Sequence, residues 1–395
     1  MNKFCWPCIC TVSLLLMSGC VTVEKGPAIA LTGDIRVDGP NAIAHGPARD
    51  KVLWEYRAAA ADMRSGNYDQ AKQYLDDALL SLGGVFGKDK EARKARGYFN
   101  EEARKTFIGE PYERVMAYYY RGILYWMNGE PDNARACFRS GQLEDSSSEG
   151  EQYNSDYVLL DYLDGLASTK LGGDGTDAFQ RAVAEDKKFH KPPAYDARAN
   201  VLFFLEFGPG PLKFASGQYR EELRFRVPPS PVHSAVIHIG GQTITAGPYD
   251  DLGFQATTRG GRVMDHVLAN KAVFKTSTDV AGNIGIVGGA VALSQRNQTS
   301  QEVGLGLLAA GILTKIVSAS TTPAADIRTW DNLPRYLSFA SVHLSPGQHV
   351  ATVEFLDFAG QPVSSLTKTI TINVPADKQD KVVFVSDTSI TPQTI

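Results

Sequence analysis

The stretch YYYRGILYWMNGEPDNARACF, residues 118–138, decides how the first half of the chain folds. Tyr118, Gly122 and Tyr125 recur at helical spacing, so they lie on one face of a helix. The sequence Gly129-Glu130-Pro131-Asp132 then turns the chain, since glycine and proline mark turns between periodic segments. The stretch therefore predicts two antiparallel helices joined by a tight turn.

A similar pattern precedes this stretch. The sequence GNYDQAKQYLDDAL, residues 66–79, has the composition of a turn followed by a second helix with an apolar stripe. Its alanine at position 71 corresponds to Ala134 in the later stretch, where Phe138 continues the apolar face. Both stretches are typical of a tetratricopeptide unit.

A third, less regular copy follows, in which Gly165 aligns with Gly122 and Phe179 with Phe138. The first offset is 43 residues and the second is 41, so we expect a turn two residues shorter in the third copy. Three units are about the minimum that buries a shared solenoid core. Residues 51–194 therefore predict a helical domain similar to a tetratricopeptide solenoid.

Aromatic and basic side chains are concentrated in the first helix of the second unit. They form either a peptide-binding groove or a core face with a few exposed tyrosines, because periodic aromatic residues mark core faces. The candidates for contact with a protein partner are Tyr112, Arg114, Tyr118, Tyr119, Arg121 and Tyr125.

Residues 195–395 predict a β-rich domain. Pro192-Pro193 end the helical part, and VLFFLEF at 201–207 predicts a buried strand before a Gly/Pro loop. Alternation at 223–227 and the turn Gly240-Gly241 predict short paired strands, as in a small β-sandwich. The expected fold class is α+β: an N-terminal α-solenoid similar to tetratricopeptide repeats, followed by a β-sandwich-like domain with an inserted Gly-rich helical hairpin.

The insertion spans about residues 261–320. Two arms rich in glycine and alanine, within 280–318, predict an αα-hairpin whose small residues permit close helix contact. Each arm is shorter than the roughly 20 apolar residues that span a bilayer. One interpretation is a hairpin buried between the two domains. The other is a hairpin that inserts in a membrane or mediates self-association.

The amino terminus carries the features of a secretory signal: Lys3, a short apolar run at residues 11–17 and the small residues Ser18 and Gly19. The sequence Met17-Ser18-Gly19-Cys20 resembles the bacterial lipobox, in which the cysteine is acylated and becomes the first mature residue.

This resemblance implies a signal peptide at residues 1–19, an acyl anchor to the membrane on Cys20 and a tether at 20–50. The next residue is Val21, where aspartate favours retention in the inner membrane. The resemblance therefore implies an outer-membrane protein that faces the periplasm.

Composition excludes several classes of function. The chain has 395 residues and a net charge of −4, so a broad basic surface for nucleic acid is not expected. Besides the signal region and Cys20, Cys137 is the remaining cysteine, so no internal disulfide is expected; its apolar helical context suits a small buried side chain. Histidine spacing and loop motifs match no zinc, nucleophile or phosphate-binding pattern. We therefore expect no metal, no cofactor and no catalysis.

Two segments resemble one family: GEPYERVMAYYYRGILY at 109–125 and ADIRTWDNLPRYL at 325–337. They are similar to signature stretches of uncharacterised Gram-negative outer-membrane lipoproteins with tetratricopeptide repeats, a family without an established activity. In the second segment, Asp326, Arg328 and Trp330 predict a structural lock, in which an ion pair lies beside an indole.

The leading functional hypothesis is a lipid-anchored envelope scaffold whose helical repeats bind an unidentified protein partner. A second is a membrane-inserting or oligomerising component that acts through residues 280–318. A third is a cell-wall glycan binder or hydrolase, which needs a cleft with paired carboxylates.

Overall fold

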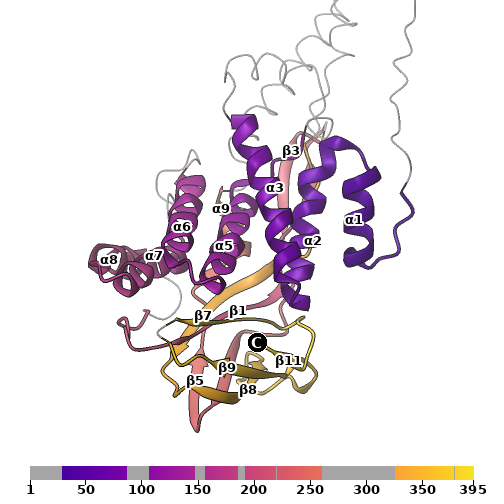
Figure 1. Cartoon of the computed structure of the whole chain (residues 1–395). Coiled ribbons are helices and arrows are strands. Elements are labelled where there is room, and N and C mark those ends of the chain that lie inside the picture. The colour runs from indigo at the N-terminus through magenta and orange to yellow at the C-terminus, as the bar shows by residue number, and fades with distance from the viewer. Residues whose placement is uncertain are drawn as a thin grey trace, which may run out of the picture.

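The computed structural model describes residues 29–86, 106–146, 156–185, 192–218, 220–259, 325–377 and 379–395. It confirms the α+β class, with most of the described helices in the first half of the chain and the described strands in the second (Figure 1). The described helices are α1 (Ile35–His45), η1 (Ala48–Asp50), α2 (Lys51–Ser65), α3 (Tyr68–Phe86), α5 (Pro111–Met127), α6 (Pro131–Ser146), α7 (Val158–Lys170), α8 (Thr176–Glu185), α9 (Leu252–Arg259) and η4 (Ser364–Leu366).

The described strands are β1 (Val201–Pro209), β2 (Leu212–Ser216), β3 (Glu222–Arg226), β4 (Ser234–Ile239), β5 (Gln242–Ala246), β6 (Asp250–Asp251), β7 (Pro334–Val342), β8 (Gly347–Leu356), β9 (Lys368–Val374), β10 (Lys381–Ser386) and β11 (Gln393–Thr394). The predicted signal peptide at 1–19, Cys20 and the Gly-rich hairpin at 280–318 lie outside the described residues.

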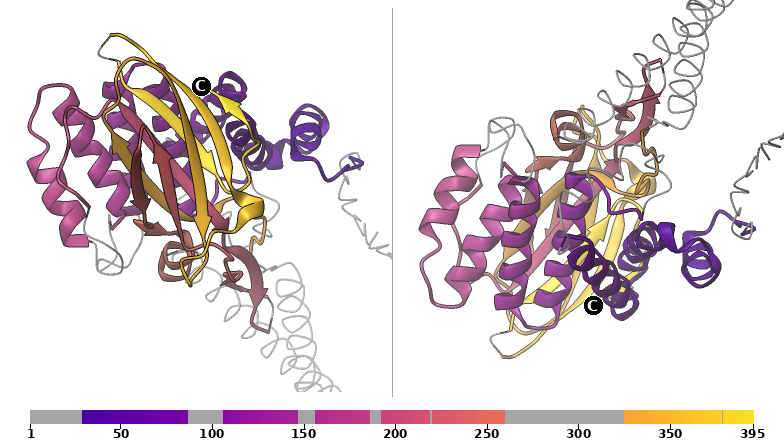
Figure 2. Two further views of the ribbon diagram at one scale, coloured as in Figure 1. Left: turned by 90° about the horizontal axis from the view of Figure 1, so that it is seen from below. Right: turned by 90° about the horizontal axis from the view of Figure 1, so that it is seen from above.

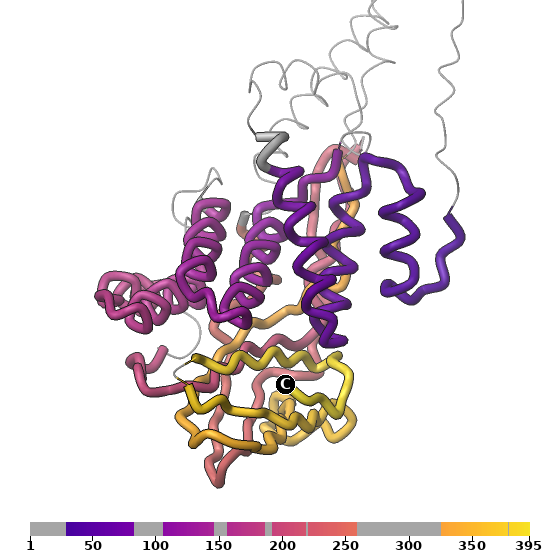
Figure 3. The backbone as a smooth tube through the Cα atoms, in the orientation of Figure 1, coloured from indigo at the N-terminus to yellow at the C-terminus, as the bar shows by residue number. Residues whose placement is uncertain are grey.

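Three pairs of consecutive helices pack as hairpins: α2 with α3, α5 with α6, and α7 with α8 (Figures 1 and 3). In each turn one glycine adopts a left-handed conformation, with φ of 78° at Gly66, 77° at Gly129 and 78° at Gly172. A residue with a Cβ is strained in this conformation. The repeated reversal of the chain therefore depends on glycine at each turn.

Residues 35–50, which we predicted as part of a tether, form α1 and η1. Asp34 caps the first turn of α1 with its carboxylate, and Asp38 is buried. Gly39 allows close packing, since a Cβ there would lie 2.9 Å from the Cβ of Ala58 in α2. The tether prediction does not hold for these residues, because packing against α2, together with the Asp34 cap, stabilises α1.

In the second hairpin, the two helices pack closely at Gly122. A Cβ on Gly122 of α5 would lie 2.5 Å from the ring of Phe138 in α6. Phe138 is fully buried, and α5 and α6 therefore approach more closely than two larger side chains would allow.

The third hairpin departs from the expected alignment. The turn between α7 and α8 spans residues 171–175, whereas the turn between α5 and α6 spans 128–130, so it is longer and not shorter. The buried positions of α8 are Ala178 and Ala182. The ring that Gly165 accommodates belongs to Tyr195, whose hydroxyl a Cβ would overlap. The alignment of Phe179 with Phe138 was therefore wrong. Tyr195, which lies outside the hairpin, packs against Gly165 as Phe138 packs against Gly122.

We expect Gly122→Ala to lower the free energy of unfolding by about 1–3 kcal/mol, because the added methyl group overpacks the Phe138 ring. Urea denaturation of the purified chain measures this loss. The double variant Gly122→Ala, Phe138→Leu should recover part of it, since leucine leaves room for the methyl group. A loss unchanged by the second substitution would contradict the contact.

The strands form two main sheets and a separate hairpin. The four-stranded sheet has the order β10-β1-β7-β6, and β1 pairs in parallel with β10 and antiparallel with β7. The five-stranded sheet has the order β11-β9-β8-β4-β5. Within the part of the chain that the structure describes, β2 and β3 form a separate two-stranded hairpin. Figure 2 shows the helices on one side of the stacked sheets.

The strand β1 is buried on both faces, as predicted for residues 201–207. Leu202 and Phe204 belong to a core shared with the helices, whereas Phe203 and Leu205 belong to a core between the two sheets. Successive side chains of a strand point to opposite faces. The four-stranded sheet is therefore the middle layer, and the helical and β halves share the core that contains Leu202 and Phe204.

Candidate functional site

The six candidate residues all lie on or at the start of α5, and the structure divides them between two faces. Tyr112 and Tyr119 face the β half: the ring of Tyr112 lies 5.8 Å from that of Phe225, and the ring of Tyr119 lies 6.3 Å from that of Phe204. Both tyrosines are 1 % exposed, and burial raises the pKa of each phenol well above its usual value. These two side chains are core residues.

The other four candidates form one stripe along α5, at spacings of four, three and four residues. We call it the outer stripe; its residues are Arg114, Tyr118, Arg121 and Tyr125. Tyr118 and Tyr125 are half-buried, and both arginines are buried. The outer stripe is therefore the part of the predicted partner site that reaches the surface.

The arginines of the outer stripe join α5 to its neighbours. Arg114 forms an ion pair with Glu144 of α6, with 2.6 Å between Nε and Oε2. Arg121 forms one with Asp76 of α3, with 2.6 Å between Nε and Oδ1, and its guanidinium lies 3.5 Å from the ring centre of Tyr125. A buried arginine held by a carboxylate and an aromatic ring is well suited to joining packed helices.

The same chemistry continues along the helical layer. Arg135 of α6 pairs with Asp164 of α7 at 2.7 Å, and Arg181 of α8 pairs with Asp161 of α7 at 3.0 Å. Burial raises the pKa of Asp161 and opposes the effect of Arg181. Arginine–carboxylate pairs thus link α3, α5, α6, α7 and α8 in succession.

The predicted lock residues follow the insertion and contact several elements. Arg328 binds the carboxylate of Asp326, with 2.5 Å between Nη2 and Oδ2, and that of Asp50 at 2.7 Å. The indole of Trp330 is fully buried and stacks on Tyr56 of α2, with 4.4 Å between ring centres. The ion pair therefore attaches the segment after the insertion to η1, and the indole attaches it to α2.

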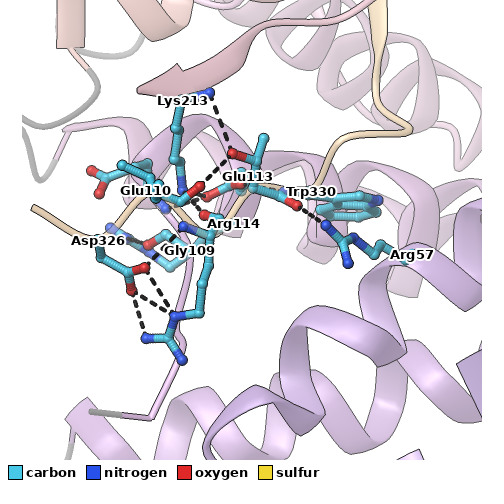
Figure 4. Close-up of polar contacts among 11 residues, drawn as sticks. Arg57, Gly109, Glu110, Glu113, Arg114, Lys213, Asp326 and Trp330 are labelled. Atoms are coloured by element: carbon cyan, nitrogen blue, oxygen red, sulfur yellow. Dashed lines mark hydrogen bonds and ion pairs between the residues drawn. The ribbon is translucent and has the colours of Figure 1, made fainter. Parts of the chain in front are cut away.

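A buried ion pair lies where α5, the β2–β3 hairpin and the segment after the insertion meet (Figure 4). Glu113 of α5 and Lys213 of β2 have side chains 0 % and 2 % exposed, with 2.5 Å between Oε2 and Nζ. Glu113 also accepts hydrogen bonds from the backbone N–H groups of Glu110, at 2.7 Å, and Trp330, at 2.8 Å. Lys213 donates a second bond to the carbonyl of Arg328, at 3.0 Å. The pair joins α5, the β2–β3 hairpin and the segment after the insertion.

A second buried carboxylate joins β1 to the helices. Glu206 accepts hydrogen bonds from Arg64 at the end of α2, at 2.6 Å, and from the hydroxyl of Tyr120 in α5, at 2.5 Å. Glu206 is the charged residue within the apolar run at 201–207. A buried carboxylate needs a charged or hydrogen-bonding partner. A single glutamate in an apolar strand was therefore a signal that β1 contacts polar side chains of another element.

Asp250 of β6 caps a helix from another part of the chain. Its two carboxylate oxygens accept hydrogen bonds from the backbone N–H groups of Val158, at 3.0 Å, and Leu159, at 2.9 Å, at the start of α7. Asp251 similarly accepts from Gly253 at the start of α9. Burial raises the pKa of Asp250 to about 8, although the two backbone bonds lower it.

This pKa predicts a pH dependence. The unfolded carboxyl releases its proton near pH 3.8 and the folded one near pH 8, so the folded state binds more protons between these values. The stabilising contribution is present below about pH 4 and is lost as the pH rises through 8. We expect the free energy of unfolding to fall over this interval less steeply in Asp250→Asn than in the parent chain. Urea denaturation at several pH values measures both slopes, and equal slopes would contradict the assignment.

Cys137 of α6 lies half-buried beside the outer stripe. Burial raises the pKa of its thiol to about 11, and a thiol that stays protonated is a poor nucleophile and metal ligand. Among the described residues no group of three or more His, Cys, Asp or Glu side chains is arranged to hold a metal ion. No described helix has the length and apolar character needed to cross a membrane.

Comparisons with protein families, with curated proteins and with solved structures find no match to this chain.

Proposed function

We propose that the chain is a non-catalytic interaction scaffold of the bacterial cell envelope. In this proposal, acyl chains on Cys20 hold it to the outer membrane, on the periplasmic side. The three helical hairpins are repeats of the tetratricopeptide type, and the stacked sheets are a β-sandwich-like support for them. A protein partner binds the helical layer.

The observation that carries this proposal is the repetition within the helical layer. Each hairpin reverses at a left-handed glycine, namely Gly66, Gly129 and Gly172. Arginine–carboxylate pairs link successive helices. Stacked hairpins of this kind present an extended surface made from the same positions of successive units.

The four-stranded sheet determines which face is available. It covers the part of α5 where Tyr119 is buried against Phe204, and the β2–β3 hairpin covers Tyr112 through Phe225. The helices α3, α6 and α8 carry exposed side chains such as Gln73, Ala136 and Gln180. We therefore place the partner on the surface that these three helices and the outer stripe share.

Site-specific photo-crosslinking in intact envelopes tests this placement. We expect a photoreactive residue at Gln73, Ala136 or Gln180 to capture the same protein, because these positions lie on successive hairpins. A residue at Thr369, exposed on the five-stranded sheet, is the control and should not capture it. Absence of a shared product, or equal capture from Thr369, would overturn the proposal.

Intact-mass spectrometry of the membrane-purified chain tests the anchor separately. We expect a mature chain that begins at Cys20 with attached acyl groups, and we expect Cys20→Ser to abolish this species. An unmodified mature chain would overturn the anchor. The hypotheses of a membrane-inserting hairpin at 280–318 and of a glycan binder stay predictions.

A further inference from the structure

The β2–β3 hairpin has one face turned to the core and one turned outward. Lys213 on the inner face reaches Glu113, and Phe225 contacts Tyr112. The register pairs Leu212 with Arg226 and Phe214 with Arg224, so these four side chains share the other face. We call this group, together with Ile327, the hairpin patch.

The hairpin patch includes two exposed apolar side chains, one on β2 and one on the segment after the insertion. Phe214 is 45 % exposed and Ile327 is 41 % exposed. The segment that carries Ile327 runs beside β2, since the backbone N–H of Lys213 donates to Thr329 Oγ1 at 3.3 Å and its Nζ donates to the carbonyl of Arg328. The two apolar residues therefore lie on adjoining segments.

Two arginines share the outward face of the hairpin with Phe214: Arg224 lies opposite it and Arg226 lies two residues further along β3. Arg224 and Arg226 are exposed, and Arg224 also binds Glu222 at 2.8 Å. The outward face of the hairpin thus carries two positive charges and one negative charge. An exposed aromatic side chain flanked by arginines is suited to the boundary between lipid headgroups and acyl chains.

The hairpin patch lies near the point where the amino-terminal arm joins the fold. Ile29 packs near Gly46 at the end of α1. The next element contains Arg49, whose carbonyl accepts a bond from Arg328, and Arg328 is bonded in turn to Lys213 of β2. Figure 1 shows β3 at the end away from the five-stranded sheet, and the described chain starts beside α1.

Eight residues lie between Cys20 and Ile29, and the nine residue-to-residue steps of an extended chain span at most about 30 Å. An anchor on Cys20 would therefore keep this end of the molecule close to the bilayer. A weak contact between a tethered patch and its own membrane gains from the high effective concentration.

We propose that the hairpin patch docks on a bilayer that contains anionic phospholipids and so orients the helical layer relative to the membrane. This rests on the acyl anchor of the proposed function. The apolar residues enter the interface and the arginines bind phosphate headgroups.

Fluorescence quenching on vesicles tests the docking. The full acylated chain, with Cys137→Ala, carries a bimane label at Ser216→Cys on the outer face of the hairpin. It is reconstituted in phosphatidylcholine–phosphatidylglycerol vesicles that contain nitroxide lipids. We expect quenching at this position.

A label at Leu171→Cys is the control, because Leu171 is 49 % exposed. It lies at the opposite end of β1 from the β2–β3 hairpin, since the neighbouring Lys170 donates to the carbonyl of Ala199, just before β1.

Substitutions in the patch should weaken docking, read as the equilibrium between quenched and unquenched label. We expect about a tenfold loss for Phe214→Ala, from the lost apolar burial. We expect about a fivefold loss for Arg224→Gln or Arg226→Gln on anionic vesicles. The matched control Arg198→Gln, whose side chain is 86 % exposed near the start of β1, should cause no loss.

Equal quenching at Ser216→Cys and Leu171→Cys on vesicle-bound chain would overturn the docking and leave the anchor standing. A chain without acyl groups by mass spectrometry would overturn the anchor. In that case unacylated chain is added to the same vesicles, and absence of quenching at Ser216→Cys overturns the hairpin patch as well. Quenching that is the same on vesicles without phosphatidylglycerol would overturn the role of anionic headgroups.

Discussion

Lys213→Met should lower the free energy of unfolding by about 3–5 kcal/mol, because it leaves the carboxylate of Glu113 buried without its cation. The Glu113 side chain is 0 % exposed and has no access to water. Its two remaining hydrogen bonds come from backbone N–H groups, and these do not replace the lost positive charge. Urea denaturation followed by far-UV circular dichroism measures the change.

Glu113→Gln should be similarly destabilising, because it leaves the ammonium of Lys213 buried and unneutralised. The double variant Glu113→Gln, Lys213→Met should lose less than Lys213→Met alone, since neither charge remains. The matched control is Arg224→Met, which removes an exposed ion pair with Glu222 on the same β hairpin and should change stability by less than about 1 kcal/mol. Additive losses in the double variant would contradict the buried pair.

Phe203→Ala and Phe204→Ala should each lower the free energy of unfolding by about 3–5 kcal/mol, although the two residues are neighbours in one strand. Phe203 packs in the core between the sheets and Phe204 in the core shared with the helices. Both side chains are 0 % exposed. Phe358→Ala is the matched control, since this ring is 71 % exposed, and should change stability by less than about 0.5 kcal/mol.

The shared core also predicts how these variants unfold. Tryptophan fluorescence reports mainly on the helical side through Trp54, Trp126 and Trp330, whereas circular dichroism reports on both halves. Because Trp126 and Trp330 lie in the same core as Phe204, we expect the two signals to change together in one transition. Two separate transitions would contradict a fold in which the four-stranded sheet joins both halves.

Local patterns predicted much of the helical layer. The turns at Gly66 and Gly129 were readable because a left-handed backbone requires glycine, and the signal lies within a few residues of the turn. The strand at 201–207 was readable because a strand buried on both faces is a continuous apolar run. The one charged residue of this strand, Glu206, indicated a contact with a polar partner. The sequence did not reveal that the partners are Arg64 and Tyr120.

The predictions for Phe179 and for the tether were wrong because contacts with distant segments, and not local spacing, determine the structure there. Phe179 has a spacing that suits the third hairpin, but Tyr195 occupies the place against Gly165. Helix α1 has a weak local pattern, and packing of Gly39 against Ala58 stabilises it. In both cases the deciding contact joins residues from different elements.

The candidate site shows the same division. The sequence by itself determined that Tyr118 and Tyr125 share one helix face, because helical spacing depends on neighbouring residues alone. It also placed all six candidates near one helix, without dividing them between two faces. Only the tertiary structure decided that β strands cover Tyr112 and Tyr119, and that Glu113 meets Lys213 one hundred residues away. The physical reason is that burial and ion pairing depend on which surfaces meet after folding, and a periodic pattern records that a face is apolar without recording what covers it.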